Sequence, residues 1–506
     1  MRSRIYDAIL KKRSVNEADP LWLSQVQKNV PGLYSAHNGR HFHALAIIPF
    51  FASKSTLMEF PISWTERLTA QLGAEAEQLL TAMEDEAVTS VRLNPAKGAD
   101  LTFFEKVPWH PNGYYLEERP VFTLDPMFHA GAYYVQEASS MFLREALVQS
   151  ANLTAPLTVL DLCAAPGGKS TLLLSELSAD SLLLANEIVP ARVPALRHNL
   201  TKWGFPNYMI SNHHPEDLSA LEVFFDVIVV DAPCSGEGLF RKDSRAIGEW
   251  SPEHAFQCAV RQQNIMESAI PLLKPGGVLI YSTCTFNPDE NEKNVAQWLE
   301  KYPLELIPLK VPESWGIKSG RYGYHFYPHR LKGEGFFLAS LRNTETGHIR
   351  HKAKQINGLT KLNKSLVPTV QKWISKANDL VLFRKGNDDL VGIPENLMEQ
   401  TSIIANALKK RSVGIKLGAL KGGKLVPSHE LSQSLVLSDD VAKMELPLED
   451  ALLFLKKEEF KVPPGSSTGW NLITYKGLGL GWVKNLQNRV NNYLPNEFRI
   501  KMDLPK

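Results

Sequence analysis

Apolar and polar positions alternate in blocks between residues 155 and 342, in a pattern that predicts strands separated by helices. Helical stretches of 15 and 22 residues, at 190–204 and 252–273, lie between short runs of aliphatic and branched residues. Strands alternating with helices of this length indicate a parallel, doubly wound α/β sheet. The predicted strands are 157–163 (LTVLDLC), 181–187 (SLLLANE), 226–232 (DVIVVDA), 277–283 (GVLIYST) and 334–341 (EGFFLASL).

The flanking segments have different patterns and predict further domains. Residues 58–150 combine a helix-like stretch at 63–83, a strand near 88–95 and a helix at 141–150, which predicts a small α/β domain. Residues 1–57 are irregular, and we interpret them as an N-terminal extension that precedes Met58. After Arg342 the chain turns polar and basic, so we expect a linker at 343–365. Short strand-like pieces then predict a partly β domain over 366–506.

Composition narrows the class of protein without identifying a partner. With 56 basic and 54 acidic residues the net charge is only +2, so any nucleic-acid surface must be a local patch. Four cysteines in 506 residues suggest no disulfide framework and match no zinc spacing, which favours reduced thiols, a cytoplasmic location and no metal. No apolar run approaches the ~18 residues of a membrane span, so we expect no membrane association.

One loop has the features of a cofactor site. The segment 161–169 (DLCAAPGGK) leaves a predicted strand and enters a helix, and its glycines allow backbone to approach a ligand at an open helix N-terminus. Glu187, twenty residues after Gly167, ends the next strand and is placed to accept hydrogen bonds from ribose hydroxyls. The loop lacks the spacing of a phosphate-binding P-loop. It therefore predicts a nucleoside-containing cofactor, with a purely structural turn as the alternative.

Two cysteines follow neighbouring predicted strands. Cys234 lies in DAPCSGEG (231–238) and Cys284 in STCTF (282–286), so both are expected at the sheet edge that carries the cofactor loop. A thiolate that adds to C6 of cytosine makes C5 nucleophilic enough to accept a methyl group. Asp231 is placed to assist as an acid near N3. A free thiol titrates near pH ~8.5, so the site must lower that pKa, and Lys169 is a candidate. Cys258 is interpreted as a packing residue.

Several motifs together resemble the RNA cytosine-5 methyltransferases of the Sun family, in particular members that act on small-subunit ribosomal RNA. The resemblance covers roughly residues 88–342, and the segment 477–500 resembles a PUA-like RNA-binding tail. The motifs are GAYYVQEASS (131–140), LDLCAAPGGKS (160–170), DAPCSGEGLFRKD (231–243), YSTCTF (281–286) and PHRLKGEGFFLA (328–339).

The resemblance implies a Rossmann-like, class I seven-stranded methyltransferase core at 151–342, with S-adenosylmethionine as the donor. It also implies RNA-binding roles for the domains at 58–150 and 366–506. Cys284 would be the nucleophile, and Cys234 would help to release the product. The family's usual adenine-binding Asp is replaced here by His213 and His214, and we assign the contact to His214. The other implied cofactor residues are Cys163, Ala164, Ala165, Pro166, Gly167, Gly168, Lys169, Glu187 and Asp231.

The same reasoning predicts how RNA is engaged. The target cytosine must be unpaired or flipped out of a helix. Arg241 and Lys242 are expected to hold flanking phosphates, and Trp250 either stacks on a base or belongs to the core. Residues 477–506 carry five basic and two acidic side chains with interleaved aromatic residues, which favours an RNA-binding surface.

We therefore expect a monomeric enzyme that methylates C5 of a cytosine in small-subunit (16S) ribosomal RNA. One alternative keeps the chemistry and changes the substrate to transfer RNA. The other is a ribosome-assembly factor that binds RNA without turnover. Intact Asp231, Cys234 and Cys284 argue against the last alternative.

Overall fold

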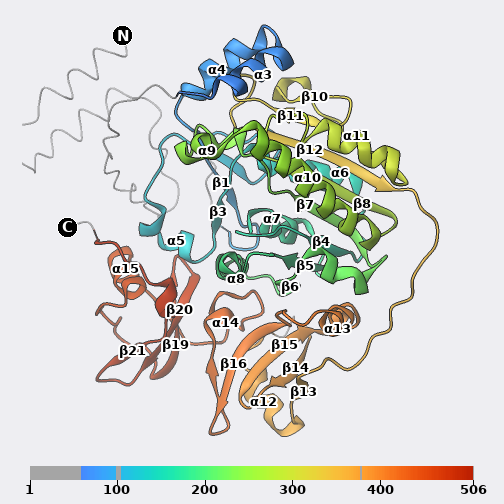
Figure 1. The fold of residues 1–506 in the computed structure, drawn as a ribbon. Coiled ribbons are helices and arrows are strands. Elements are labelled where there is room, and N and C mark those ends of the chain that lie inside the picture. Colours follow the sequence, from blue (N-terminus) through green and yellow to red (C-terminus); the bar gives the residue numbers. More distant parts are fainter. Residues whose placement is uncertain (1–58, 99–103, 376–378, 505–506) are drawn as a thin grey trace, which may run out of the picture. The chain divides into compact units, whose positions relative to one another are not determined.

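A nine-stranded sheet forms the centre of the computed structural model, which describes residues 59–98, 104–375 and 379–504. The predicted extension at 1–57 lies outside these residues. The strand order is β10-β11-β12-β8-β7-β4-β5-β6, and β9 pairs with β12 (Figure 1). The strands are β4 (Thr158–Asp161), β5 (Leu182–Asn186), β6 (Tyr208–Ser211), β7 (Phe225–Asp231), β8 (Leu273–Thr283), β9 (Leu304–Leu306), β10 (Lys318–Ser319), β11 (Tyr324–Phe326) and β12 (Phe336–Asn343).

The sheet is doubly wound around β4. This strand pairs in parallel with β5 on one side and β7 on the other, so the chain builds one half of the sheet and then returns to build the second. The predicted α/β class is confirmed, and all five predicted strands are present. Every residue of β4 and β5 is buried, because helices cover both faces of the sheet. The short strands β9, β10 and β11 bring the sheet to nine strands, where the resemblance implied seven.

Helices connect the parallel strands and begin at clear sequence signals. Helix α10 has Ser251 as its N-cap, whose side chain accepts a hydrogen bond from the backbone N–H of His254, and Pro252 occupies its first position. Cys258 is buried on the inner face of α10, as expected for a packing residue. The connecting helices are α7 (Gly168–Glu176), α8 (Val193–Trp203), α10 (Pro252–Ala269) and α11 (Glu292–Lys301).

The N-terminal part consists of two short helices and a three-stranded antiparallel sheet in the order β2-β1-β3. The single helix predicted over 63–83 is wrong. Gly73, whose φ of 59° favours glycine, ends helix α3, and helix α4 begins two residues later. The elements are α3 (Ile62–Leu72), α4 (Glu75–Glu84), β1 (Thr89–Leu93), β2 (Gly113–Leu116), α5 (Pro126–His129), β3 (Tyr133–Val135) and α6 (Leu143–Ser150).

The C-terminal part contains a five-stranded sheet and a four-stranded sheet. The backbone N–H of Ser412 donates to the carbonyl of Ile210 on β6 over 2.8 Å, which joins this part to the central sheet. The stretch 343–365, expected to be a linker, carries β13. The elements are β13 (Leu359–Lys361), α12 (Val367–Gln371), β14 (Leu380–Lys385), β15 (Asp389–Pro394), α13 (Met398–Ala407), β16 (Ile415–Lys421), β17 (Lys424–Pro427), α14 (His429–Gln433), β18 (Lys443–Glu445), α15 (Leu448–Lys456), β19 (Gly469–Tyr475), β20 (Leu478–Asn485) and β21 (Val490–Asn492).

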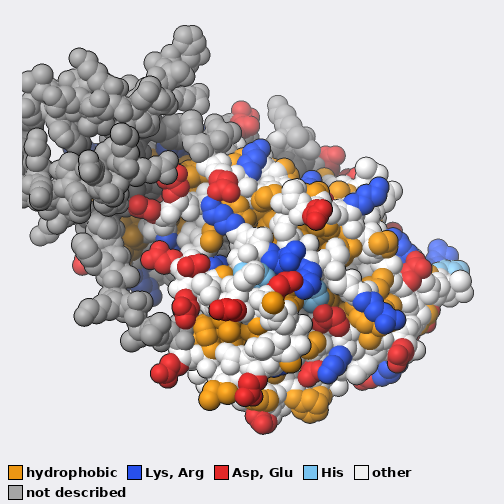
Figure 2. Space-filling model, turned by 90° about the horizontal axis from the view of Figure 1, so that it is seen from above, with side chains coloured by type: hydrophobic (Ala, Val, Ile, Leu, Met, Phe, Trp, Pro, Cys, Tyr) orange, Lys and Arg blue, Asp and Glu red, His pale blue; other side chains and the backbone are white. Residues whose placement is uncertain are grey.

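The surface has a mixed charge. Figure 2 shows one face of the molecule, on which basic and acidic side chains are interspersed, in keeping with the net charge of +2. Among the helices that the structure describes, none combines the length and the apolar composition that a bilayer span requires. Any strongly basic surface must therefore be a local cluster of side chains.

Two glycines allow close packing of the loops that follow β7 and β8. A Cβ atom on Gly238 would lie 2.3 Å from the carbonyl oxygen of Gly335, and one on Gly335 would lie 2.4 Å from Cζ of Phe286. Both distances are far below van der Waals contact. The loops that contain Cys234 and Cys284 can therefore approach the start of β12 only because these positions lack side chains.

We predict that Gly335→Ala lowers the free energy of unfolding by about 1–3 kcal/mol, the usual cost of overpacking. Urea unfolding followed by tryptophan fluorescence would measure this change. Gly248→Ala is the matched control, because a Cβ at this position of helix α9 (Ser244–Glu249) meets no atom within 4 Å. Equal stability of the Gly335 variant and the control would contradict the packing argument.

Candidate active site

The pairing of two strands brings two sulfur atoms together. Strand β7 runs parallel to β8, with Asp231 directly opposite Ser282, so the loops that follow both strands leave the same edge of the sheet. The Sγ atoms of Cys234 and Cys284 are 2.9 Å apart, and the backbone N–H of Cys284 donates to Sγ of Cys234 over 3.3 Å. Both cysteines are half-buried. The structure thus brings together the two cysteines that the sequence singled out.

A charged pair lies at the same edge of the sheet. Nζ of Lys169, on the first turn of α7, is 2.7 Å from Oδ2 of Asp231. The other carboxylate oxygen of Asp231 accepts a hydrogen bond from the Ser282 hydroxyl over 2.8 Å. Burial acts to lower the pKa of Lys169, but the charge and hydrogen bond of Asp231 outweigh it and raise that pKa above its ordinary value. The ammonium group therefore stays protonated beside the cysteines.

The Cys234 thiol holds its proton firmly. The hydrogen bond to Cys284 and then burial raise the pKa of the Cys234 thiol well above its ordinary value. A thiol that donates to a neighbouring sulfur stabilises negative charge on that neighbour. The Cys234 thiol is therefore protonated, with its Sγ 2.9 Å from the sulfur of Cys284.

A cavity of about 190 Å³ lies over the glycine-rich loop. Gly167 adopts a left-handed conformation with φ of 111°, and no side chain caps the N-terminus of α7, so its first N–H groups remain available to a ligand. A Cβ on Gly168 would lie 3.2 Å from the ring of Tyr134 and would narrow the cavity. Among the predicted cofactor residues, those that line the cavity are Cys163, Ala164, Ala165, Pro166, Gly168, Lys169 and Asp231.

The opposite wall of this cavity was missed by the sequence reasoning. Five residues line it, and all five belong to the GAYYVQEASS motif: Tyr134, Val135, Gln136, Glu137 and Ser140. From the sequence, that motif indicated only the resemblance to a methyltransferase family and no contact with a cofactor. These residues lie beyond the central domain, so their position depends on how β3 packs against the cofactor loop.

Three predicted cofactor contacts lie outside the cavity lining: Gly167, Glu187 and His214. Glu187 is buried, and its carboxylate accepts hydrogen bonds from the backbone N–H groups of Val189 and Ala165 over 2.8 and 3.3 Å. The Glu187 side chain thus stabilises the backbone of the cofactor loop, and it forms an ion pair with Arg192 at 3.3 Å. His214 is exposed at the start of the 3-10 turn that follows β6.

His213, the other candidate for the adenine contact, is engaged elsewhere. Its Nε2 accepts a hydrogen bond from the backbone N–H of Lys410 over 3.0 Å, and its Nδ1 lies 3.4 Å from Asp217. Nε2 of His213 therefore holds the segment before β16, whereas its Nδ1 faces the 3-10 turn that follows β6. This geometry argues against an adenine contact from His213.

The structure argues against the predicted phosphate contact of Arg241. Its guanidinium is buried and binds both carboxylate oxygens of Glu334 at 3.0 Å, as well as the carbonyls of Gly333 and Ala82. Lys242 is partly exposed, with its Nζ 3.7 Å from Glu334. Trp250 is a core residue rather than a stacking platform, because it is 7% exposed and packs in the cluster with Trp64.

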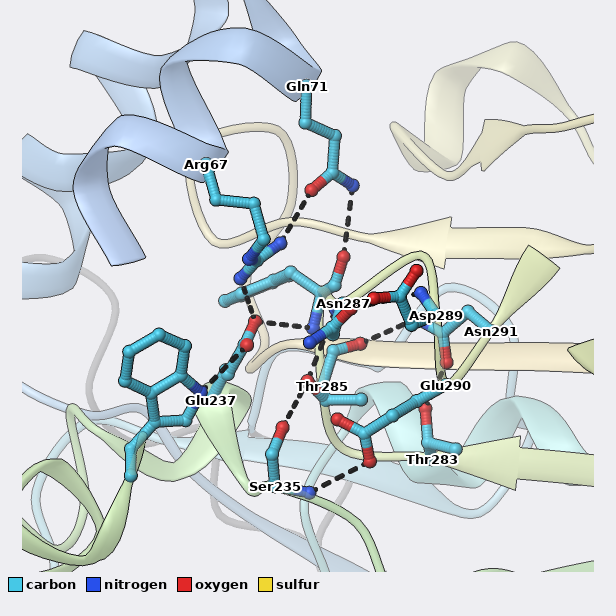
Figure 3. Close-up of polar contacts among 12 residues, drawn as sticks. Arg67, Gln71, Ser235, Glu237, Thr283, Thr285, Asn287, Asp289, Glu290 and Asn291 are labelled. Atoms are coloured by element: carbon cyan, nitrogen blue, oxygen red, sulfur yellow. Dashed lines mark hydrogen bonds and ion pairs between the residues drawn. The ribbon is translucent and has the colours of Figure 1, made fainter. Parts of the chain in front are cut away.

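A buried carboxylate connects both cysteine loops to the N-terminal helix (Figure 3). Glu237 is fully buried and accepts hydrogen bonds from the indole of Trp250 over 3.0 Å and from the backbone N–H of Phe286 over 3.2 Å. Arg67 of α3 forms an ion pair with Glu237 at 2.6 Å. The carbonyl of Cys284 also accepts from the N–H of Gly238 over 2.9 Å. The Glu237 carboxylate thus holds the backbone that follows Cys284, and the neighbouring Gly238 N–H holds the Cys284 carbonyl.

A second buried carboxyl lies beneath the Cys234 loop. Oε2 of Glu290 accepts hydrogen bonds from the backbone N–H of Ser235 and the side chain of Gln262, each over 2.9 Å. Oε1 has no hydrogen-bond partner among the described residues. Burial raises the pKa of Glu290 to about 7. The sequence alone did not identify Glu237, Arg67 or Glu290, because their partners lie far away in the chain.

Three family models match successive parts of the chain. The model described as 16S rRNA methyltransferase RsmB/F matches residues 150–342. The N-terminal domain of 16S rRNA methyltransferase RsmF matches residues 60–138, and the methyltransferase RsmF PUA domain matches residues 441–500. Along the chain the matched segments therefore run in the order N-terminal domain, methyltransferase domain and PUA domain.

Whole proteins are similar over most of the chain. Ribosomal RNA small subunit methyltransferase F from Escherichia coli O7:K1 (strain IAI39 / ExPEC) is 30% identical over 465 residues, which cover 83% of this chain and 92% of that protein. The enzyme of that name from Shigella boydii serotype 18 (strain CDC 3083-94 / BS512) is 29% identical over the same shares. A solved methyltransferase homologue from Pyrococcus horikoshii has 29% identity and a TM-score of 0.50, covering 56% of this chain and 96% of its own.

These matches agree with the class of fold and with the motifs that the sequence presents. Together they show that the chain belongs to the ribosomal RNA small subunit methyltransferase F family of RNA methyltransferase enzymes.

Proposed function

We propose that this enzyme transfers a methyl group from S-adenosylmethionine to C5 of a cytosine in small-subunit ribosomal RNA, through a covalent bond between Cys284 and C6. The observation that carries the proposal is the 2.9 Å approach of the Cys234 and Cys284 sulfurs beside the Lys169–Asp231 pair. The ribosomal substrate is supported by the names of the relatives, which are ribosomal RNA small subunit methyltransferases.

The residues around the glycine-rich loop fit a nucleoside-containing methyl donor. The cavity over the loop and the uncapped N-terminus of α7 leave room for a ligand to contact the backbone directly. The ring of Tyr134 lies so close to Gly168 that a side chain at position 168 would narrow this space. When bound, S-adenosylmethionine supplies an electrophilic methyl group on a positively charged sulfur. The segment from Cys163 to Lys169 would hold it, with the side chain of Asp231 at the end of the cavity near the cysteines.

The chain's own groups then account for activation of the pyrimidine. The thiolate of Cys284 bonds to C6, and the electron pair displaced from the C5–C6 double bond moves through the ring to N3, which takes up a proton. The Lys169–Asp231 pair supplies that proton or hydrogen-bonds the ring. The charge of Lys169 and the thiol of Cys234 both stabilise the Cys284 thiolate before it attacks.

Product release needs a base and then expulsion of the thiolate. When C5 bonds to the methyl group, N3 returns its proton to the Lys169–Asp231 pair. A base then takes the C5 proton, and the electrons of that C–H bond restore the C5–C6 double bond while the bond between C6 and Sγ of Cys284 breaks and the thiolate leaves. Sγ of Cys234 lies 2.9 Å from that sulfur. We therefore assign Cys234 to the release step.

Substitution of the two cysteines should separate the steps. We expect Cys284→Ala to abolish methyl transfer, because no carbon–sulfur bond can form. Cys234→Ala should accumulate a covalent protein–RNA species that survives denaturing gel electrophoresis. Normal turnover by the Cys284 variant, or equal and adduct-free loss of activity in both variants, would contradict the assignment.

The substrate can be identified by methylating purified RNAs with the full chain. We expect transfer to one cytosine in small-subunit ribosomal RNA, either free or in an assembled subunit, and mapping by bisulfite sequencing would locate it. Transfer to a transfer RNA with none to ribosomal RNA would favour the alternative substrate. For each RNA, a catalytic-site variant of matched stability gives the background level of methyl transfer.

Protonation of Glu290 should give stability a measurable pH dependence. Its pKa is about 7 in the folded protein, against about 4.3 in an unfolded chain, so the folded state holds a proton that the unfolded state loses between these values. Stability due to this group is therefore present below about pH 4.3 and is lost as the pH rises towards 7.

We predict that Glu290→Gln becomes more stable relative to the wild type as the pH rises from about 5 to about 8. The expected change is roughly 2–3 kcal/mol, because one pKa unit corresponds to about 1.4 kcal/mol. Urea unfolding at both pH values would measure it. Asp161 and Glu430, whose pKa values burial also raises to about 7, titrate in both proteins and cancel in the difference. Parallel pH profiles of wild type and variant would refute the prediction.

A further inference from the structure

A second cavity lies in the C-terminal part of the chain, outside the catalytic site. Its volume is about 370 Å³, within the range of roughly 300–1,000 Å³ that is usual for small-molecule sites. The residues that line it come from the end of α12 and the start of β17 on one side, and from β19 and β20 on the other. We call it the seam pocket, because it joins the five-stranded and four-stranded sheets. Its principal lining residues are Lys372, Trp373, Lys424, Leu425, Trp470 and Lys484.

The charge of the seam pocket is unbalanced. Three of its lining residues are lysines and none is acidic. Neither Lys372, Lys424 nor Lys484 forms an ion pair with any residue that the structure describes. Other lysines of the same part are paired, such as Lys416 with Asp389 at 2.9 Å. Three uncompensated ammonium groups around one cavity attract an anion with several negative charges.

The seam pocket also offers aromatic surface. Trp470 is half-buried, is held edge-on by Tyr493 at a ring distance of 4.5 Å, and has Nζ of Lys484 at 5.9 Å from its ring centre. Trp373 packs edge-on against Trp482, and its indole N–H is buried with no acceptor among the described residues. An aromatic face beside cationic side chains is the arrangement that binds a base and its phosphate in single-stranded nucleic acid.

We propose that the seam pocket binds one nucleotide of single-stranded RNA, with the base against Trp470 and the flanking phosphates near Lys372, Lys424 and Lys484. The proposal deepens the proposed function, because it rests on RNA being the substrate. Lys372 and Lys424 lie outside the segments matched by the three family models, so this site is not contained in the PUA domain at 441–500. It would anchor a substrate segment distant from the methylated cytosine.

Binding of a labelled RNA to the full chain tests the proposal. The probe is a single-stranded RNA of about ten nucleotides, and fluorescence anisotropy is measured between about 50 and 200 mM salt. The pocket variant is Lys372→Gln combined with Lys424→Gln and Lys484→Gln. The matched control replaces the exposed lysines Lys352, Lys361 and Lys409 by Gln, which removes the same charge elsewhere.

The pocket variant should flatten the dependence of log Kd on log salt by about 2, since each phosphate contact contributes about 0.7 for single strands. Trp470→Ala should weaken binding about tenfold with little change in the salt slope, and Trp470→Phe should restore most of the affinity. In the methylation assay these variants should raise KM for RNA and leave kcat unchanged.

Two results would overturn the seam pocket as an RNA site. One is an equal loss of affinity in the pocket variant and the control, which would mean that only net charge matters. The other is wild-type affinity in both the pocket variant and Trp470→Ala. If instead the wild-type enzyme methylates no RNA, the proposed function fails, while the anisotropy measurement still decides whether the pocket binds RNA.

Discussion

Parallel pairing of β7 with β8 is the constraint on which the catalytic arrangement depends. Because Asp231 lies opposite Ser282, the residues that follow each strand must emerge side by side at the carboxyl edge of the sheet. The cofactor loop after β4 opens at the same edge, next to the point where the sheet reverses its direction of growth. Backbone hydrogen bonds thus determine which side chains meet, before any specific side-chain contact is considered.

Buried polar contacts then fix the loops that the strands have brought together. Glu237 connects the Cys234 loop to the backbone after Cys284, and Arg67 supplies its counter-charge from α3. Removal of one partner from a buried ion pair leaves an uncompensated charge, which is costly. The N-terminal helix is therefore part of the support of the catalytic loops. The absence of side chains at Gly238 and Gly335 allows this packing on the opposite side.

Much of the fold could be predicted from the sequence, because the central strands are continuous apolar runs bounded by loops. Their order along the chain also placed the cysteines and the glycine-rich loop at one edge. Strand β6 was not predicted, since its four residues form a short run with a polar end. The break at Gly73 was missed because the helical pattern continues on both sides.

Side-chain orientation was the part that sequence could not supply. Arg241 was expected to face RNA, yet Glu334, 93 residues further along the chain, holds it in the interior. The role of Glu237 likewise depends on Arg67, which is 170 residues away. The seam pocket joins residues from two sheets, and only the fold reveals that their charges are uncompensated. The roles of Cys284, Cys234 and Asp231 remain predictions that the geometry supports.

Peptide mapping of a trapped complex tests the proposed sulfur–carbon bond most directly. RNA that carries 5-fluorocytidine has no C5 proton to lose, so elimination is blocked and the enzyme remains attached after methyl transfer. We predict that protease digestion and mass spectrometry of this complex will find the nucleotide on the peptide that contains Cys284. A nucleotide attached to Cys234 instead, or full methyl transfer with no attached peptide, would contradict the mechanism.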